Sequence, residues 1–255
     1  MSISRRDFFS IAFVGAIFNA CKKEAQTVNE ETPEYPSDDI LSARFNKKLT
    51  IGEHERLVFV GDSITWGHRD AAILEPNKGL GDGYVQEIAR LLASKSMLKE
   101  CAVYNRGVSG NTTKDLLTRL DKDVISLKPT IAVVLIGVND LRHNFKPEEF
   151  YYNYNNILKN LQEKVPGVKL VVCEPFILSN MEGYSGYLPV FTEYRRQIRK
   201  LAKEVGAIFV PYYDAFFHAL QTAEAKTLLY DGFHPTPAGI KIISNKWIEY
   251  CSFHK

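Results

Sequence analysis

The stretch TIAVVLIGVND, residues 130–140, decides the fold of this chain. It places β-branched and aliphatic residues one after another, without the alternation of a half-exposed strand. Such a run is typical of a central strand with both faces buried, as in a parallel sheet covered by helices. The apolar run is interrupted by a glycine at 137, and after one valine it gives way to Asn139 and Asp140. Polar, reactive groups are therefore expected directly after this strand.

Strand-like and helix-like segments alternate on both sides of this run. Short apolar segments predict strands, and apolar residues at helical spacing predict helices. This alternation implies a parallel, doubly wound sheet with right-handed crossovers. We predict an α/β fold of three layers, α/β/α, with five parallel strands in the flavodoxin-like order 2-1-3-4-5. The predicted strands are 56–63, 101–108, 130–140, 168–175 and 207–212, and the predicted helices are 83–94, 111–120, 147–165, 189–205, 214–223 and 237–250.

Composition narrows the class of protein. A chain of 255 residues is long enough for one α/β domain and short for two enzyme domains. Its formal net charge is +2, with no basic stripe, which argues against a nucleic-acid partner. Cys101, Cys173 and Cys251 lack Cys-x-x-Cys spacing, so neither a disulfide framework nor a zinc site is expected. Buried free thiols are the simplest interpretation.

The first residues resemble a targeting segment. SRRDFF, residues 4–9, pairs two arginines with an apolar run that is too short to span a membrane, and it resembles a twin-arginine export motif. IFNAC resembles a relaxed lipobox, with Cys21 as the lipidated residue. The alternative is an ordinary signal peptide or an uncleaved anchor with an incidental cysteine. We predict an export signal at 1–20, a polar tether at 21–45 and a catalytic domain at 46–255, lipid-anchored in a bacterial cell envelope.

The stretch DGFHPT, residues 231–236, carries an aspartate three residues before a histidine. This pair could be two metal ligands, a polar turn, or two thirds of a hydrolase triad. A metal pair needs a third ligand, and no His, Cys or carboxylate cluster stands near it in the sequence. A triad needs a nucleophile, and Ser63 follows the first predicted strand. In the predicted order that strand lies between the strands ending at Gly107 and Asn139, and ligands bind at this edge of such sheets.

These residue types fit acyl transfer. A serine hydroxyl becomes a nucleophile when a base such as His234 takes its proton, and Asp231 can hold the imidazole in the right tautomer. The tetrahedral intermediate needs preorganised donors for its oxyanion. We predict that the backbone N–H groups of Ser63 and Gly107 and the side-chain amide of Asn139 supply them.

Four blocks together carry a family resemblance: GDSITWG (61–67), NRGVSGNT (105–112), GVND (137–140) and DGFHP (231–235). In this order they resemble the SGNH, or GDSL, hydrolases, over residues 57–250. The resemblance implies the flavodoxin-like fold of that family, a serine nucleophile, the Asp-x-x-His pair and no metal or cofactor. The longer stretches FVGDSITWGHRD, GLGDGYVQEIARLL and RGVSGNTTKDLLTRLDKDVISLKPT resemble its acetylxylan-esterase branch.

That branch implies removal of O-acetyl groups from carbohydrate, with oligosaccharide esters as substrates, and its relatives can be homo-oligomers. A lysophospholipase or thioesterase of the same family is an alternative substrate class. A non-catalytic glycan-binding lipoprotein is a third, which would require a broken triad. Residues that flank the blocks are candidates for substrate binding, although each could equally pack in the core, brace the backbone or face solvent: Asp62, Trp66, His68, His143 and Tyr230.

Overall fold

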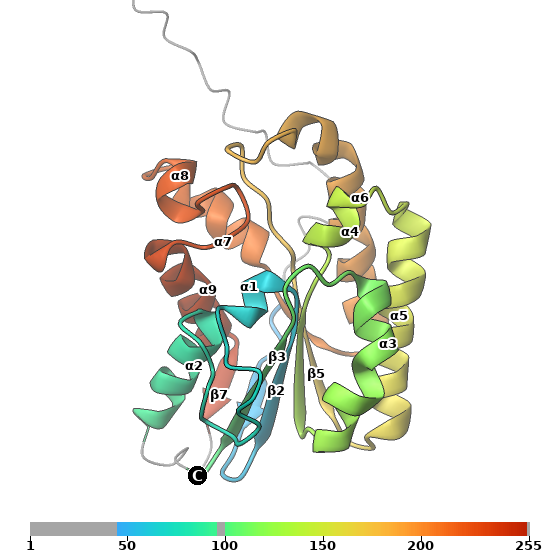
Figure 1. Ribbon diagram of the computed structural model, residues 1–255, viewed down its shortest axis with the longest axis vertical. Coiled ribbons are helices and arrows are strands. Elements are labelled where there is room, and N and C mark those ends of the chain that lie inside the picture. The colour runs from blue at the N-terminus through green and yellow to red at the C-terminus, as the bar shows by residue number, and fades with distance from the viewer. Residues whose placement is uncertain (1–44, 96–99, 254–255) are drawn as a thin grey trace, which may run out of the picture. The chain divides into compact units, whose positions relative to one another are not determined.

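A five-stranded parallel sheet forms the centre of the computed structural model, which describes residues 45–95 and 100–253 (Figure 1). Its strand order is β3-β2-β4-β5-β6, which confirms the predicted flavodoxin-like order. The central strand is buried along its whole length, as its unbroken apolar sequence predicts. The strands are β2 (Arg56–Gly61), β3 (Ala102–Gly107), β4 (Ile131–Leu135), β5 (Lys169–Cys173) and β6 (Ile208–Val210).

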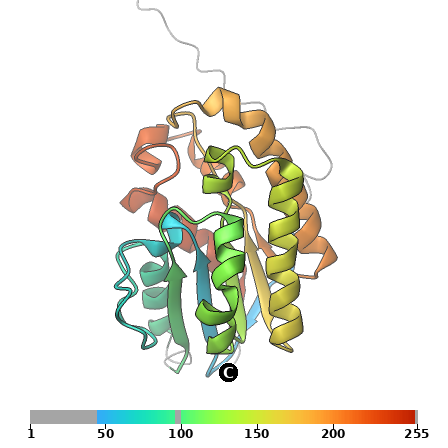
Figure 2. The ribbon, with the colours of Figure 1, turned by 45° about the vertical axis from the view of Figure 1, so that its right-hand side comes forward.

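Helices cover both faces of this sheet, which gives the predicted three layers (Figures 1 and 2). One layer contains α2 (Tyr84–Ala93), α7 (Tyr212–Ala219) and α9 (Pro237–Glu249), and the other contains α3 (Thr113–Asp123), α5 (Pro147–Lys164) and α6 (Tyr184–Glu204). Local chemistry fixes several helix starts. Thr112 and Asp115 form a capping box for α3, and Pro237 occupies the first turn of α9, as predicted.

The structure differs from the sequence-based expectation in its short elements. Helix α6 begins at Tyr184 rather than at the predicted residue 189, so Pro189 lies inside it. One-turn helices, a 3₁₀ turn and a small parallel pair of strands were not predicted, because three to five residues carry no readable periodicity. They are α1 (Ser63–Trp66), α4 (Val138–Arg142), α8 (Ala225–Leu228), the 3₁₀ turn Ile125–Leu127, and β1 (Leu49–Ile51) paired with β7 (Cys251–Phe253).

The predicted export signal, Cys21 and nearly all of the predicted tether lie outside the described residues. Phe45, the last residue of that tether, packs with its ring 4.3 Å from the ring of Phe209. The folded part therefore includes this residue. In the described ranges, no helix has the length and apolar character needed to cross a bilayer. Cys101, Cys173 and Cys251 form no disulfide with one another.

Candidate active site

Ser63 stands at the carboxyl edge of the sheet, immediately after β2. The strand ends at Gly61, where an added Cβ would lie 2.0 Å from the Leu135 carbonyl oxygen, so only glycine fits between the two strands. Asp62 caps the next helix, because its Oδ1 accepts a hydrogen bond from the Ile64 N–H at 2.9 Å. Ser63 is thus the first residue of α1, held by a buried strand on one side and a capped turn on the other.

The aspartate and histidine lie on a tight turn before α9. The Tyr230 N–H donates to the His234 carbonyl at 2.8 Å, which closes the turn. Gly232 has a φ of +89°, and a side chain there would collide with the Met181 backbone. Asp231 Oδ1 accepts the His234 backbone N–H at 2.9 Å. The conformation of the turn therefore orients the aspartate and the imidazole toward each other, independently of the serine.

Hydrogen bonds join these three side chains in a line. His234 Nδ1 lies 2.7 Å from Asp231 Oδ2, and His234 Nε2 lies 2.8 Å from Ser63 Oγ. Partial burial opposes ionisation of Asp231, but the N–H groups of His234 and Phe233 outweigh it and lower the pKa of this carboxyl. An ionised carboxylate accepts the Nδ1 proton, which leaves Nε2 to accept the serine proton. Both ring nitrogens are engaged in this way, so the geometry favours the triad interpretation of DGFHPT over a metal pair.

Asn139 lies next to the loop that follows β3. It belongs to α4, and its Nδ2 donates to the Asn111 carbonyl at 3.0 Å, which uses one of its two amide protons. In the same loop, Gly110 has a φ of +80° and nothing within 4 Å of an added Cβ. Among the described residues, the backbone N–H groups of Ser63 and Gly110 donate to no protein acceptor. These two N–H groups and the second Asn139 proton are therefore available to a ligand.

Gly107 does not match the role that the sequence predicts for it. Its backbone N–H donates to the Asn105 side chain at 2.9 Å, so this donor is already used. An added Cβ would lie 2.1 Å from the Trp66 backbone nitrogen. Glycine is required here so that β3 can approach α1. The Gly107 N–H is therefore not available as the predicted oxyanion donor, whereas the Gly110 N–H donates to no acceptor among the described residues.

Two polar side chains that the sequence analysis missed hold this edge together, of which Asn105 is buried and Arg119 is partly buried. Asn105 Nδ2 donates to the carbonyls of Thr65 and Leu80, each at 2.8 Å. The Arg119 guanidinium donates to the Gly61 carbonyl at 3.0 Å. It also binds the Arg106 carbonyl, Asn111 Oδ1 and Asp123 Oδ2. Polar residues inside apolar segments were the available signal, since buried polar groups are almost always hydrogen-bonded.

The structure places the predicted substrate-binding residues in different surroundings. Asp62 is fully buried under α1, which contradicts direct contact with a substrate and leaves it as a brace for the turn. His68 forms an ion pair with Asp82 at 2.9 Å and stacks edge-on against Trp66, and both members of the pair are exposed. His143 caps the end of α4 and is exposed. Tyr230 is 68% exposed and lines a cavity beside Asp231.

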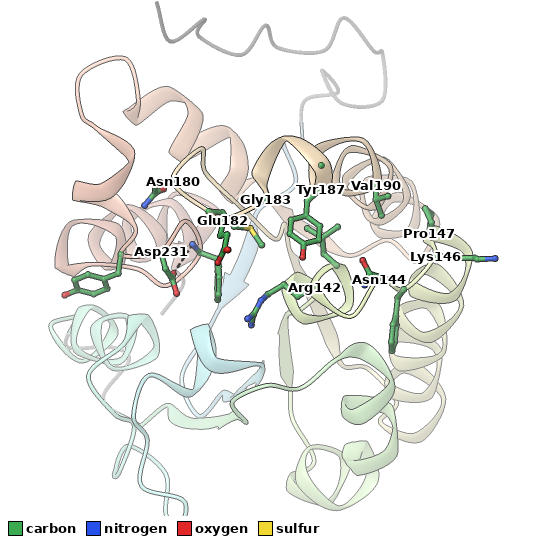
Figure 3. A pocket seen from close by; sticks show the side chains of 16 residues that line it. Arg142, Asn144, Lys146, Pro147, Asn180, Glu182, Gly183, Tyr187, Val190 and Asp231 are labelled. Carbon is green, nitrogen blue, oxygen red and sulfur yellow. Dashed lines mark hydrogen bonds between the residues drawn. The ribbon is translucent and has the colours of Figure 1, made fainter. Parts of the chain in front are cut away.

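That cavity, of about 940 Å³, opens next to the turn that carries Asp231 (Figure 3). Its walls come from α4, the start of α6 and the 230–233 turn, and they mix aromatic, amide and charged side chains. The cavity thus reaches the Ser63–His234–Asp231 line at Asp231, whereas Ser63, His234 and Asn139 do not line it. Its polar and charged lining residues are Arg142, Asn144, Lys146, Asn180, Glu182 and Asp231.

Comparison with known proteins agrees with this geometry. The profile of the GDSL-like lipase/acylhydrolase family matches residues 59–242. The chain belongs to this family. Like its relatives it is a carboxylic ester hydrolase. An acetylxylan esterase of Geobacillus stearothermophilus is 33% identical over 214 residues, which cover 80% of this chain and 97% of the relative.

Solved structures of GDSL-like hydrolases superimpose well. A GDSL-like lipase from Parabacteroides merdae has a TM-score of 0.74 and 33% identity, covering 82% of this chain and 98% of the other. The crystal structure of the Geobacillus acetylxylan esterase has a TM-score of 0.73 and 27% identity, covering 81% and 98%. Two further crystal structures are catalytic mutants of that esterase, in which alanine replaces a histidine or a serine.

Proposed function

We propose that this GDSL-like hydrolase is a serine esterase that removes O-acetyl groups from carbohydrate. The single observation that carries the proposal is the continuous line of hydrogen bonds from Asp231 through His234 to Ser63, at 2.7 and 2.8 Å. A hydroxyl is activated when a positioned base accepts its proton. The catalytic serine and histidine of the related acetylxylan esterase support these roles.

In the proposed reaction, His234 Nε2 accepts the Ser63 proton while Oγ attacks the acetyl carbonyl. The tetrahedral intermediate collapses as the sugar oxygen leaves, and that oxygen takes the proton from His234. Ser63 then carries the acetyl group. Water attacks this acyl-enzyme while His234 Nε2 accepts its proton. The second tetrahedral intermediate collapses as its bond to Ser63 Oγ breaks, Oγ takes the proton back from His234, and the acetyl group leaves as acetic acid, which ionises to acetate. Asp231 stays ionised throughout and stabilises the imidazolium that forms twice in each cycle.

The intermediate's oxyanion is proposed to meet the N–H groups of Ser63 and Gly110 and one Asn139 amide proton. All three are free of protein acceptors in the described part of the chain, as judged from the hydrogen bonds above. The Asn111 carbonyl fixes the Asn139 amide before substrate arrives. Preorganised donors of this kind need no rearrangement when the charge develops.

The carbohydrate substrate is supported by the cavity and by the relatives. A fatty-acyl chain needs a channel that is apolar throughout. This cavity instead combines apolar side chains such as Met181 and Val190 with amides and charged groups, beside Tyr187 and Tyr230. Tyrosines beside hydrogen-bonding groups suit a sugar, which is apolar on its ring faces and polar at its hydroxyls. The acetylxylan esterase relative supports the same substrate class.

The test is acetate release from acetylated xylo-oligosaccharides, together with p-nitrophenyl esters of increasing chain length. We expect activity on acetyl esters that falls beyond propionyl, and a loss on the order of 10⁶-fold in kcat for Ser63→Ala. Turnover retained by Ser63→Ala would contradict the mechanism. A preference for long acyl chains would instead indicate a lysophospholipase or thioesterase.

We also propose that the chain is exported and anchored to the cell envelope through Cys21. The support is the order of two arginines, a short apolar run and a cysteine in residues 4–21. Mass spectrometry of the mature chain tests this, since lipidation adds acyl groups to a new N-terminal Cys21. A mature Cys21→Ala protein that stays in the membrane fraction would contradict it.

A further inference from the structure

One cation extends into the cavity beside the proposed active site. Arg142 is the last residue of α4, and its side chain points into the middle of the cavity, whereas Lys146 extends away from it (Figure 3). Arg142 is exposed and, among the described residues, forms no ion pair. An unpaired guanidinium aimed into a binding cavity is a ready partner for an anionic group of the ligand.

Two contacts place this cation close to the chemistry. Arg142 follows Asn139 by three residues on α4, so the two side chains share one face of the helix. The Arg142 guanidinium lies 5.2 Å from the Phe233 ring centre, and that ring lies 4.3 Å from the His234 ring. The cation is therefore one helical turn from the proposed oxyanion donor and one aromatic ring from the proposed base.

The carboxylates of the cavity do not neutralise Arg142. Asp231 accepts the His234 ring N–H and the backbone N–H groups of His234 and Phe233, so its oxygens are committed. Glu182 lines the same cavity and forms no ion pair within the described ranges. In the structure the guanidinium fork is open to the ligand.

We propose that Arg142 binds the carboxylate of a uronic acid located one sugar unit from the acetylated hydroxyl. This inference rests on the proposed deacetylation of carbohydrate and names its substrate class, acetylated acidic oligosaccharides. A planar guanidinium binds a carboxylate through two parallel hydrogen bonds, which a neutral sugar hydroxyl cannot match. A phosphate would carry about two charges, whereas of the two described cations that line the cavity, Arg142 points into it and Lys146 extends away.

The experiment compares kcat/KM for acetate release from acetylated xylo-oligosaccharides with and without a glucuronic acid branch. The wild-type enzyme should prefer the acidic substrate, and Arg142→Gln should lower the acidic-to-neutral ratio about 10-fold, the effect of losing a charge-assisted pair. Lys159→Gln removes the same charge from an exposed side chain of α5 that does not line the cavity, and it should keep the wild-type ratio. The preference should weaken in high salt.

Equal losses on both substrates in Arg142→Gln, or no acidic preference in the wild type, would overturn the inference. A second measurement separates this from failure of the proposed function. Glucuronic-acid-branched oligosaccharides without acetyl groups should inhibit hydrolysis of p-nitrophenyl acetate competitively, and Arg142→Gln should raise the inhibition constant about 10-fold. That inhibition requires no acetylated sugar to be a substrate. Its absence in the wild type contradicts the role of Arg142 even if acetate release is observed.

Discussion

Replacing Asp62 by asparagine should change how the stability of this hydrolase depends on pH. Asp62 lies buried under the nucleophile turn, and its Oδ2 has no hydrogen-bond partner in the described structure. Burial, with a smaller contribution from the Asp140 carboxylate, raises the pKa of Asp62 from 3.8 to about 7. The folded state therefore holds a proton that the unfolded chain has already lost at neutral pH.

The sign follows from this difference. Because the folded pKa is raised, the stability contributed by protonated Asp62 is present at low pH and is lost as pH rises through 7. Each pKa unit corresponds to about 1.4 kcal/mol, so the wild type should lose about 2–3 kcal/mol of unfolding free energy from this group between pH 5 and 8. Asp62→Asn keeps the capping oxygen and has no proton to lose. Between pH 5 and 8 the unfolding free energy of the variant should therefore rise by that amount relative to the wild type, which corresponds to roughly 5–10 °C in Tm.

Urea denaturation at several pH values measures this gain. Asp70→Asn is the matched control, because Asp70 is exposed and its Oδ1 accepts the Ala72 N–H with the same two-residue spacing. Its stability difference from the wild type should change little between pH 5 and 8. A pH-independent difference between Asp62→Asn and the wild type would refute the reasoning, since it would mean that Asp62 is not protonated in the folded protein.

Three further substitutions test the edge of the sheet. Gly107→Ala should lower the free energy of unfolding, measured in urea, by about 1–3 kcal/mol, because the added Cβ would collide with the Trp66 backbone. Unchanged stability would contradict the close approach of β3 to α1. Arg119→Met should cost about 2–3 kcal/mol, because Asp123 and three other acceptors lose a partly buried charged donor, and Arg119→Lys should recover only part. Asn139→Ala should lower kcat on p-nitrophenyl acetate by about 10²–10³-fold with a smaller change in KM, and an unchanged kcat would exclude this amide from the oxyanion site.

The sheet and its order could be predicted because each strand needed only local information. The 130–140 run is apolar on both faces, and its neighbours alternate with helix-length segments, which leaves few topologies. Ser63, Asn139 and His234 were found in the same way, as polar residues directly after apolar runs or before a capped helix. The short helices α1 and α4 were not found, although they set the directions of Ser63 and Asn139. Four or five residues have no period to read.

Gly107 shows what the sequence could not reveal. A glycine at a strand end can be required for a free backbone N–H, for a left-handed turn or for close approach of a neighbouring backbone. The sequence alone does not distinguish these three requirements. Which of these roles Gly107 has depends on Asn105, whose side-chain oxygen accepts a hydrogen bond from the Gly107 N–H within the same strand. That contact and the open surroundings of Gly110 exist only in three dimensions. The proposed role of Arg142 could not be predicted for a similar reason, since no sequence pattern distinguishes this arginine from other exposed arginines at helix ends.

The proposed nucleophile and base come from opposite ends of the folded part, and packing between β2 and α9 brings them together. Phe59 of β2 packs against the buried Trp247 of α9, with ring centres 5.6 Å apart. Ser63 begins α1, two residues after that strand ends, and His234 precedes Thr236, the N-cap of α9. Because Thr236 also donates to the Thr227 carbonyl, the end of the histidine turn is held by α8 as well as by α9. The 2.8 Å contact between Ser63 Oγ and His234 Nε2 therefore depends on the rigid seating of one helix on one strand.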